Sequence, residues 1–223
     1  MTNRLQSHTA RRADYVGFLY RFPFAFDAYR LGFATGARED GSLQQDPYDT
    51  ATVPVWILDN DFKNPDYTRT VDRVAEVEPR VAIIGDADDA QLARYYVYLA
   101  RELRDQVDAL RRVVIVPKSR SALDALDEHA GDVTLGYPIG YSSTHATDFS
   151  TADDWGGHDV HILGGSPQRR WAEIRALTAS GQTRLDSFAA GGASLANVVG
   201  LDSNVLARVA YKGERWTPEP PHW

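Results

Sequence analysis

The sequence alternates short apolar runs with segments of helical periodicity, and this alternation limits the folds open to the chain. Apolar runs occur at residues 81–84, 113–116, 133–135 and 160–163, and each is followed directly by Gly or Pro. Runs this short and this apolar are typical of parallel strands buried on both faces. Helical segments separate them, and no hairpin signal joins them. The pattern predicts an α/β protein with a parallel sheet wrapped by helices.

The helical segments between these runs have recognisable ends. Asn64 is expected to cap a helix that Pro65 opens and that ends before Pro79. After Asp88, apolar and tyrosine side chains recur every three or four residues as far as Leu110, which predicts a long amphipathic helix.

The last predicted helix follows the run at residues 160–163. Ser166 is expected to cap it and Pro167 to occupy its first turn. Trp171, Ile174 and Leu177 recur at helical spacing, so we expect them to face the core.

The number of strands favours a barrel. Seven strands can be counted from residues 15–20 to residues 183–187, and an eighth is not evident. A chain of 223 residues suits one domain, because α/β barrels of about 200 to 250 residues usually form one. We therefore predict a single (β/α) TIM-like barrel over residues 1–223, complete or with fewer than eight strands. An open doubly wound sheet is the alternative.

Composition narrows the chemistry. The chain has no Cys, which excludes disulfides, thiolate metal sites and a cysteine nucleophile. No apolar run approaches the roughly 18 residues that span a bilayer, and no secretory signal begins the chain, so we expect a cytoplasmic protein without a membrane partner. The net charge of −7 argues against a general nucleic-acid binder, but residues 157–216 hold 7 bases against 5 acids.

Acidic residues stand at the ends of two predicted strands. The apolar segment at residues 53–58 leads directly into Asp59, Asn60 and Asp61, and Asp86 closely follows the run at residues 81–84. In parallel α/β folds the loops after the carboxyl ends of the strands carry the functional site. These acids are therefore candidates for catalysis.

One interpretation of Asp59 and Asp61 is phosphoryl transfer. Hydrophobic residues followed by Asp-x-Asp resemble the beginning of haloacid-dehalogenase-like phosphatases. There the first acid attacks phosphorus, the second moves a proton and magnesium offsets the charge. The later acids at residues 86–89 come too early for the order of parts in that family. A barrel that only binds nucleotide, nucleic acid or another partner is a third possibility.

A second resemblance covers roughly residues 53–210. The segments "DVHILGGSPQRRWAEIRAL" and "GQTRLDSFAAGGASLANVVG" resemble the late part of the tRNA-guanine transglycosylase barrel. In that family a strand ends in a Gly-rich turn, and the next strand ends in an Asp followed by a small residue. "LDNDF" and "IIGDADD" stand where the family has its two other functional Asp residues. Lys118 and Ser119 replace a Gln-Gly-Gly turn, and the zinc-binding Cys cluster is absent. The chain is therefore similar to the enzymes that insert 7-deazaguanine bases into phage or bacterial DNA.

The resemblance implies exchange of guanine in nucleic acid for a preQ0-like base through a covalent aspartyl–sugar intermediate. Asp186 would be the nucleophile, Asp59 the acid/base and Asp86 the residue that reads the base edge. No metal and no redox cofactor is expected. The partners would be nucleic acid, DNA rather than tRNA, and a small deazapurine, with a homodimer left open. Further substrate-binding candidates are Asn60, Phe62, Lys118, Gly140, Gly164, Gly165 and Ser166. Phosphate-binding candidates are Arg169, Arg170, Arg175, Arg208, Lys212 and Arg215.

Each candidate also has a purely structural interpretation. Asp59 would then end a strand, Asp86 would cap the long helix, and Asp186 would pair with a nearby arginine. Gly164 and the two residues after it would form a tight turn instead of an anion site. His161 lies in an apolar strand and is expected to be a core histidine with satisfied hydrogen bonds.

Overall fold

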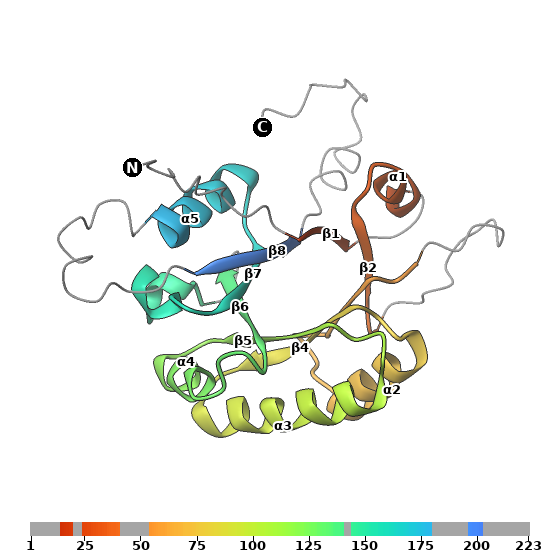
Figure 1. Ribbon diagram of the computed structural model, residues 1–223, viewed down its shortest axis with the longest axis horizontal. Coiled ribbons are helices and arrows are strands. Elements are labelled where there is room, and N and C mark those ends of the chain that lie inside the picture. Colours follow the sequence, from red (N-terminus) through yellow and green to blue (C-terminus); the bar gives the residue numbers. More distant parts are fainter. Residues whose placement is uncertain (1–13, 20–23, 41–53, 141–143, 180–195, 203–223) are drawn as a thin grey trace, which may run out of the picture.

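The computed structural model describes residues 14–19, 24–40, 54–140, 144–179 and 196–202. In this part of the chain, eight parallel strands form a closed barrel in which every strand pairs with the next in sequence (Figure 1). The last strand pairs with the first, where Tyr15 lies opposite Gly200. The strands are β1 (Tyr15–Leu19), β2 (Ala34–Arg38), β3 (Ile57–Asp59), β4 (Val81–Ala87), β5 (Arg112–Pro117), β6 (Thr134–Ile139), β7 (Asp159–Gly164) and β8 (Asn197–Asp202). The closed parallel barrel confirms the TIM-like prediction and rules out the open sheet.

Helices follow most of the strands and cover the outside of the barrel (Figure 1). They are α1 (Phe24–Arg30), α2 (Tyr67–Val77), α3 (Ala90–Gln106), α4 (Arg120–Asp127) and α5 (Pro167–Ala179), with short 3₁₀ turns η1 (Ala146–Asp148) and η2 (Ala152–Trp155). None of the described helices is long and apolar enough to cross a bilayer.

The starts of the helices are set by acidic and hydroxyl side chains. Asp66 caps α2 by accepting the backbone N–H of Arg69, so the prediction of Asn64 as the cap is wrong. Asp89 caps α3 in the same way. The structural interpretation of Asp86 as a helix cap is therefore also wrong, and its side chain is left for another role.

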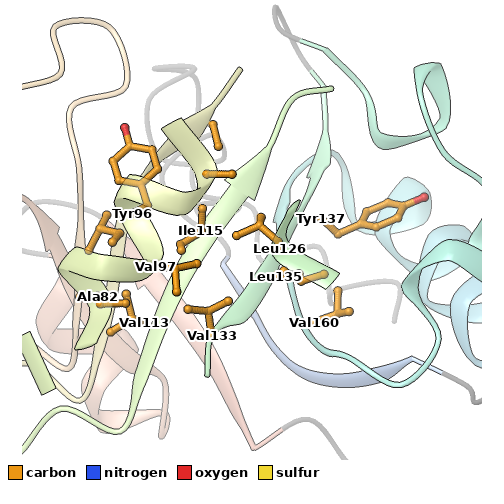
Figure 2. Packing of buried hydrophobic residues seen from close by; sticks show 14 of the residues in the cluster. Ala82, Tyr96, Val97, Val113, Ile115, Leu126, Val133, Leu135, Tyr137 and Val160 are labelled. Atoms are coloured by element: carbon orange, nitrogen blue, oxygen red, sulfur yellow. The ribbon is translucent and has the colours of Figure 1, made fainter. Parts of the chain in front are cut away.

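The barrel separates two hydrophobic cores. The inner one contains Ile57, Ile83 and Val114, which point into the barrel. The outer one lies between strands and helices, where Val97 of α3 and Leu126 of α4 pack on the strands from β4 to β7 (Figure 2). Side chains alternate between the two cores along each strand.

Two strands, β2 and β8, were missing from the sequence prediction. In β2 the inward position is Gly36, and a Cβ there would lie 2.6 Å from the carbonyl oxygen of Ile57. In β8 it is Gly200, where a Cβ would lie 2.5 Å from the ring of Tyr15. Large side chains from neighbouring strands fill these places, so β2 and β8 lack the apolar run by which strands were recognised. The strand predicted at residues 183–187 lies outside the described residues.

Candidate active site at the carboxyl ends of the strands

Three carboxylates meet at the rim formed by the carboxyl ends of the strands, which is called the mouth below. Asp59 ends β3, Asp86 lies near the end of β4, and Asp202 ends β8. Because all eight strands are parallel, these ends lie at the same side of the barrel. We refer to Asp59, Asp86 and Asp202 as the mouth carboxylates.

The register of the strands turns the mouth carboxylates toward the barrel axis. Asp59 is two residues beyond Ile57 of the inner core, and Asp86 pairs with Val116, which belongs to the same core. Asp202 is two residues beyond Gly200, where Tyr15 fills the interior. Residues two apart in a strand share a face, so all three side chains start from inward positions.

The side chains of the inner core connect β3 with β8. A Cβ on Gly17 would lie 2.5 Å from Cδ1 of Ile57 and 3.6 Å from Cα of Asp202. Ile57 therefore reaches across the interior to β1, next to the residue that ends β8. Asp59 stands one inward position above Ile57, so it and Asp202 border the same end of the interior.

Asp59 and Asp202 differ in what surrounds their charges. Burial raises the pKa of Asp59 well above its ordinary value, and the charges of Asp202 and Asp86 raise this pKa further, against smaller opposing effects of the charge of Arg38 and the N–H of Asn60. Burial also raises the pKa of Asp202, but the charge of Arg170 and the N–H of Gly164 act in the opposite direction. That N–H donates to Oδ1 of Asp202 at 3.0 Å. Asp202 is therefore the better stabilised anion, and Asp59 holds a proton more readily.

Asp86 has a fixed cationic partner. Nζ of Lys118 lies 3.1 Å from Oδ2 of Asp86, and the lysine side chain is mostly buried. Burial raises the pKa of Asp86, whereas the charge and hydrogen bond of Lys118 lower it. This pair offers an acceptor and a donor side by side at the mouth.

Asp61 is engaged in a separate network beside the mouth. Its carboxylate binds Arg38 at 2.6 Å and accepts the backbone N–H of Lys63 and the side-chain amide of Asn64. Asp61 is only 5% exposed, so its side chain does not face solvent. With these contacts, Asp61 is not free to act with Asp59 as the second acid of a phosphohydrolase.

The glycine turn at the end of β7 is explained by the backbone conformation and packing of the barrel. Gly164 and Gly165 have φ of 72° and 75°, which favours glycine, and a Cβ on Gly165 would lie 2.8 Å from the side chain of Ile139. Ser166 caps α5, as predicted, by accepting the N–H of Arg169. The N–H of Gly164 is directed to Asp202 instead of an external anion.

Arg170 is buried and Trp171 is exposed, the reverse of what the sequence predicted for them. Arg170 is 5% exposed, and its Nε donates to the carbonyl of Gly164 at 2.6 Å. Its burial beside Asp202 argues against a surface contact with phosphate. Trp171, expected in the core, is 63% exposed, so that prediction is wrong, whereas Leu177 is buried as expected.

The remaining candidates are spread around the mouth and beyond it. Asn60 is buried, and its backbone N–H donates to the carbonyl of Ile83 at 3.1 Å. Phe62 is about half exposed, and the carbonyl of Gly140 lies 3.5 Å from Nη1 of Arg169. Asp186, Arg208, Lys212 and Arg215 lie outside the described residues, so their roles stay predictions.

The barrel interior below the mouth holds His161, which is buried as predicted. Its Nε2 has no hydrogen-bond partner among the described residues, so the expectation of satisfied hydrogen bonds is wrong. The hydroxyl of Tyr15 lies 2.7 Å from Nδ1 of His161. Burial and, second to it, the charge of Arg170 lower the pKa of His161 to about 3. The described residues contain no group of three His, Asp or Glu side chains placed to hold a metal ion.

Sequence reasoning missed Asp202, Arg38 and the buried position of Arg170. The signal for Asp202 was present, since "VVGLDS" combines a short apolar run with Asp and Ser at its end. Nothing in the periodicity of α5 could have indicated that an arginine is buried and a tryptophan exposed.

Comparison with known protein families places the chain. A model described as "Family of unknown function (DUF6610)" matches residues 28–222. The chain belongs to this family. The DUF6610 match includes β2 to β8 and all three mouth carboxylates, while β1 precedes it. No curated protein and no solved structure matches the chain.

Proposed function

We propose that the protein exchanges a guanine base in nucleic acid for a 7-deazaguanine-type base, using Asp202 and Asp59 as its catalytic pair. The observation that carries the proposal is the contrast between two carboxyls at one end of the barrel. Asp202 is stabilised as an anion by Arg170 and Gly164, and its charge raises the pKa of Asp59. Such separation of two pKa values is how enzymes divide the acid and nucleophile roles between carboxyl groups.

The nucleophile role moves from Asp186 to Asp202 in this proposal. The transglycosylase resemblance requires an Asp, followed by a small residue, at the end of the strand after the Gly-rich turn. The strand that follows β7 in the barrel is β8, and it ends in Asp202, with Ser203 next in sequence. Asp186 lies in the connection between α5 and β8, so Asp202 meets the requirement better.

The proposed reaction has two balanced steps. In the first, a carboxylate oxygen of Asp202 bonds to C1′ of the nucleotide as the bond from C1′ to the guanine nitrogen breaks. The departing base takes the proton of Asp59. In the second, the incoming base gives a proton to Asp59, and its nitrogen bonds to C1′ while the ester to Asp202 breaks. The enzyme returns to its starting state without metal or redox chemistry.

The ion pair of Asp86 and Lys118 is suited to recognising the base. The edge of guanine shared by 7-deazaguanines presents N–H donors beside a carbonyl oxygen. Asp86 would accept from the donors and Lys118 would donate to the oxygen. Adenine presents a different pattern on this edge, so the pair would favour guanine-like bases.

The target nucleotide must leave its base stack to reach this site. In a duplex C1′ and the glycosidic nitrogen are shielded, so the enzyme must act on unpaired nucleic acid or on an extruded nucleotide. Asp59, Asp86 and Asp202 all border the mouth, which is open to one nucleotide at a time in this mechanism.

The decisive experiment incubates the protein with DNA or tRNA and radiolabelled preQ0, in the presence of a chelator. Incorporation of label is expected with the wild-type protein, and a covalent protein–nucleic acid adduct should appear on denaturing gels. Asp202→Asn should form no adduct, whereas Asp186→Asn should form it normally. An adduct that persists in Asp202→Asn but disappears in Asp186→Asn would return the nucleophile to Asp186. Absence of incorporation with every nucleic acid would refute the base exchange itself.

A further inference from the structure

The helix α5 carries a different exposed face from the other long helices of the barrel. Its exposed residues are Gln168, Arg169, Trp171, Ala172, Arg175, Ala176 and Thr178, and none of them is acidic. The one acid of α5, Glu173, is mostly buried and accepts a hydrogen bond of 2.8 Å from the hydroxyl of Tyr137. The outer face of α5 is therefore positive, on a chain whose net charge is −7.

Five of the six arginines on α2, α3 and α4 form ion pairs with acids, and the sixth, Arg104, donates to the backbone carbonyl of Asp132. The ion pairs are Arg69–Glu39, Arg73–Glu76, Arg94–Glu128, Arg101–Asp132 and Arg120–Asp124. Arg169 and Arg175 of α5 form no ion pair with any of the described residues, and Arg169 only approaches the carbonyl of Gly140. Two arginine charges on α5 thus remain uncompensated within the part of the chain described.

Because residues two apart on a helix do not face each other, Arg175 and not Arg169 lies beside Trp171. The Trp171 side chain is 63% exposed, and Arg175 follows it at the i+4 spacing that places two side chains together on a helix. Ala172 and Ala176 are small, so they leave the faces of the indole ring accessible. A large aromatic side chain exposed to this degree is available for contact with a ligand.

Tyr98 on α3 gives a comparison within the same molecule. It is 57% exposed and also has arginines at i−4 and i+3. Both of these, Arg94 and Arg101, are held by acids. Exposure of an aromatic ring among arginines is therefore shared by two helices, and free positive charge distinguishes α5.

The exposed face of α5 begins close to the mouth. α5 begins three residues after Gly164, whose N–H binds Asp202, and Arg170 of its first turns reaches back to the carbonyl of Gly164. A ligand that lies along α5 therefore extends from the place where Asp202 stands.

We propose that this face binds an unpaired stretch of nucleic acid beside the target nucleotide, with Trp171 stacked on a base and Arg169 and Arg175 on phosphates. The inference rests on the proposed function, because it assigns the partner of the same site. A strand without its complement is favoured over a duplex, since stacking on an indole requires a base whose flat face is free. Arginine provides the phosphate contacts and the salt dependence of such grooves.

Binding is measured with a fluorescein-labelled single-stranded DNA of mixed sequence that forms no hairpin. Trp171→Ala should weaken binding about tenfold, as loss of one stacked base does, and Trp171→Phe should restore most of the affinity. Tyr98→Ala, the matched control on α3, should bind like the wild type. Arg175→Gln should lower the slope of log affinity against log salt by about 0.7, the contribution of one phosphate contact on a single strand.

Several results would overturn the inference. One is a Trp171→Ala protein that binds the strand as tightly as the wild type, or that loses no more affinity than Tyr98→Ala does. Self-association that disappears in Trp171→Ala while strand binding is unchanged would assign the face to a second copy of the chain.

The same variants separate this inference from the proposed reaction. Asp202→Asn should bind the strand normally, because it keeps α5 intact. If the wild type shows no base exchange but still binds the strand through Trp171, the proposed reaction is refuted and the inferred binding face is retained. If base exchange occurs and Trp171→Ala binds and reacts like wild type, the face fails and the reaction stands.

Discussion

The two ends of the barrel both contain inward or rim aspartates, but only one end neutralises them. At the amino ends of the strands, Arg112 lies between Asp14 and Asp159, and Asp159 also accepts a hydrogen bond of 2.7 Å from Asn197. At the mouth, neither Asp59 nor Asp202 forms a salt bridge with any described residue, and only Asp86 has a lysine beside it.

This difference indicates which charged residues stabilise the fold and which could act on a substrate. A closed ion pair stabilises the molecule and has no charge left for a substrate. At the mouth, the charges of Asp202 and Asp86 add to burial in raising the pKa of Asp59, and carboxyls perturbed in this way are frequent at functional sites. In our proposal, the amino ends stabilise the barrel and the carboxyl ends carry the reaction.

The largest effect is expected for Asp202→Asn. Loss of the nucleophile should reduce base exchange by about a thousandfold or more, measured as the initial rate of preQ0 incorporation. Thermal stability should change little, because the gain from removing a buried carboxylate is offset by the loss of its charge beside Arg170. A large fall in melting temperature would show instead that Asp202 is a structural residue like Asp159.

The interior between the two ends of the barrel is closely packed, and Gly200→Ala tests how much this packing contributes to stability. The added Cβ would lie 2.6 Å from the hydroxyl oxygen of Tyr15, so Tyr15 must move away from His161. We expect a loss of about 2 kcal/mol in the free energy of unfolding, typical of overpacking in a core. Urea denaturation measures it. Gly131→Ala provides a control for positive φ without crowding, because nothing lies within 4 Å of a Cβ there.

Apolar runs predicted the strands that present large side chains, and they failed where the barrel places glycine. β4, β5, β6 and β7 were located from sequence because each contains a short, mostly apolar run followed by Gly or Pro. β2 and β8 were not predicted, since Gly36 and Gly200 make room for Leu19 and Tyr15 of a neighbouring strand. This dependence of one strand on its neighbour's side chain is a tertiary effect that no local pattern contains.

The residues of the candidate site were likewise predicted only where their strands were recognised. Asp59, Asp86 and Lys118 could be named because each follows a recognisable strand, whereas Asp202 was hidden with β8. The helix α5 shows a further limit, because periodicity assigns Trp171 to the core by its hydrophobicity. The barrel instead needs a cation at Arg170 to balance Asp202, and burying that residue turns Trp171 outward.

A smaller effect is expected at the amino ends of the strands. Asp159→Asn removes one of the two acids that hold Arg112 but keeps the size of the side chain. The pair is partly exposed to solvent, which weakens its charge interaction, so we expect a loss of about 1 kcal/mol. Urea denaturation gives the stability, and the rate of base exchange should remain unchanged. A variant with normal stability and a reduced rate would contradict the division between the two ends.

The smallest effect is the dependence of stability on pH at Asp59. Its pKa in the folded protein is raised well above the ordinary value of 3.8. Below about 3.8 the carboxyl is protonated in both states, and stability is at its full value. As the pH rises from there through the raised pKa, the unfolded chain ionises more readily and the wild type loses stability. Asp59→Asn carries no such proton, so its melting temperature should exceed that of the wild type by a margin that grows with pH and then levels off. Melting curves of the two proteins between pH 4 and pH 8 give this margin. A constant margin would mean that Asp59 ionises as easily in the barrel as in water, and the mouth would then have no prepared acid.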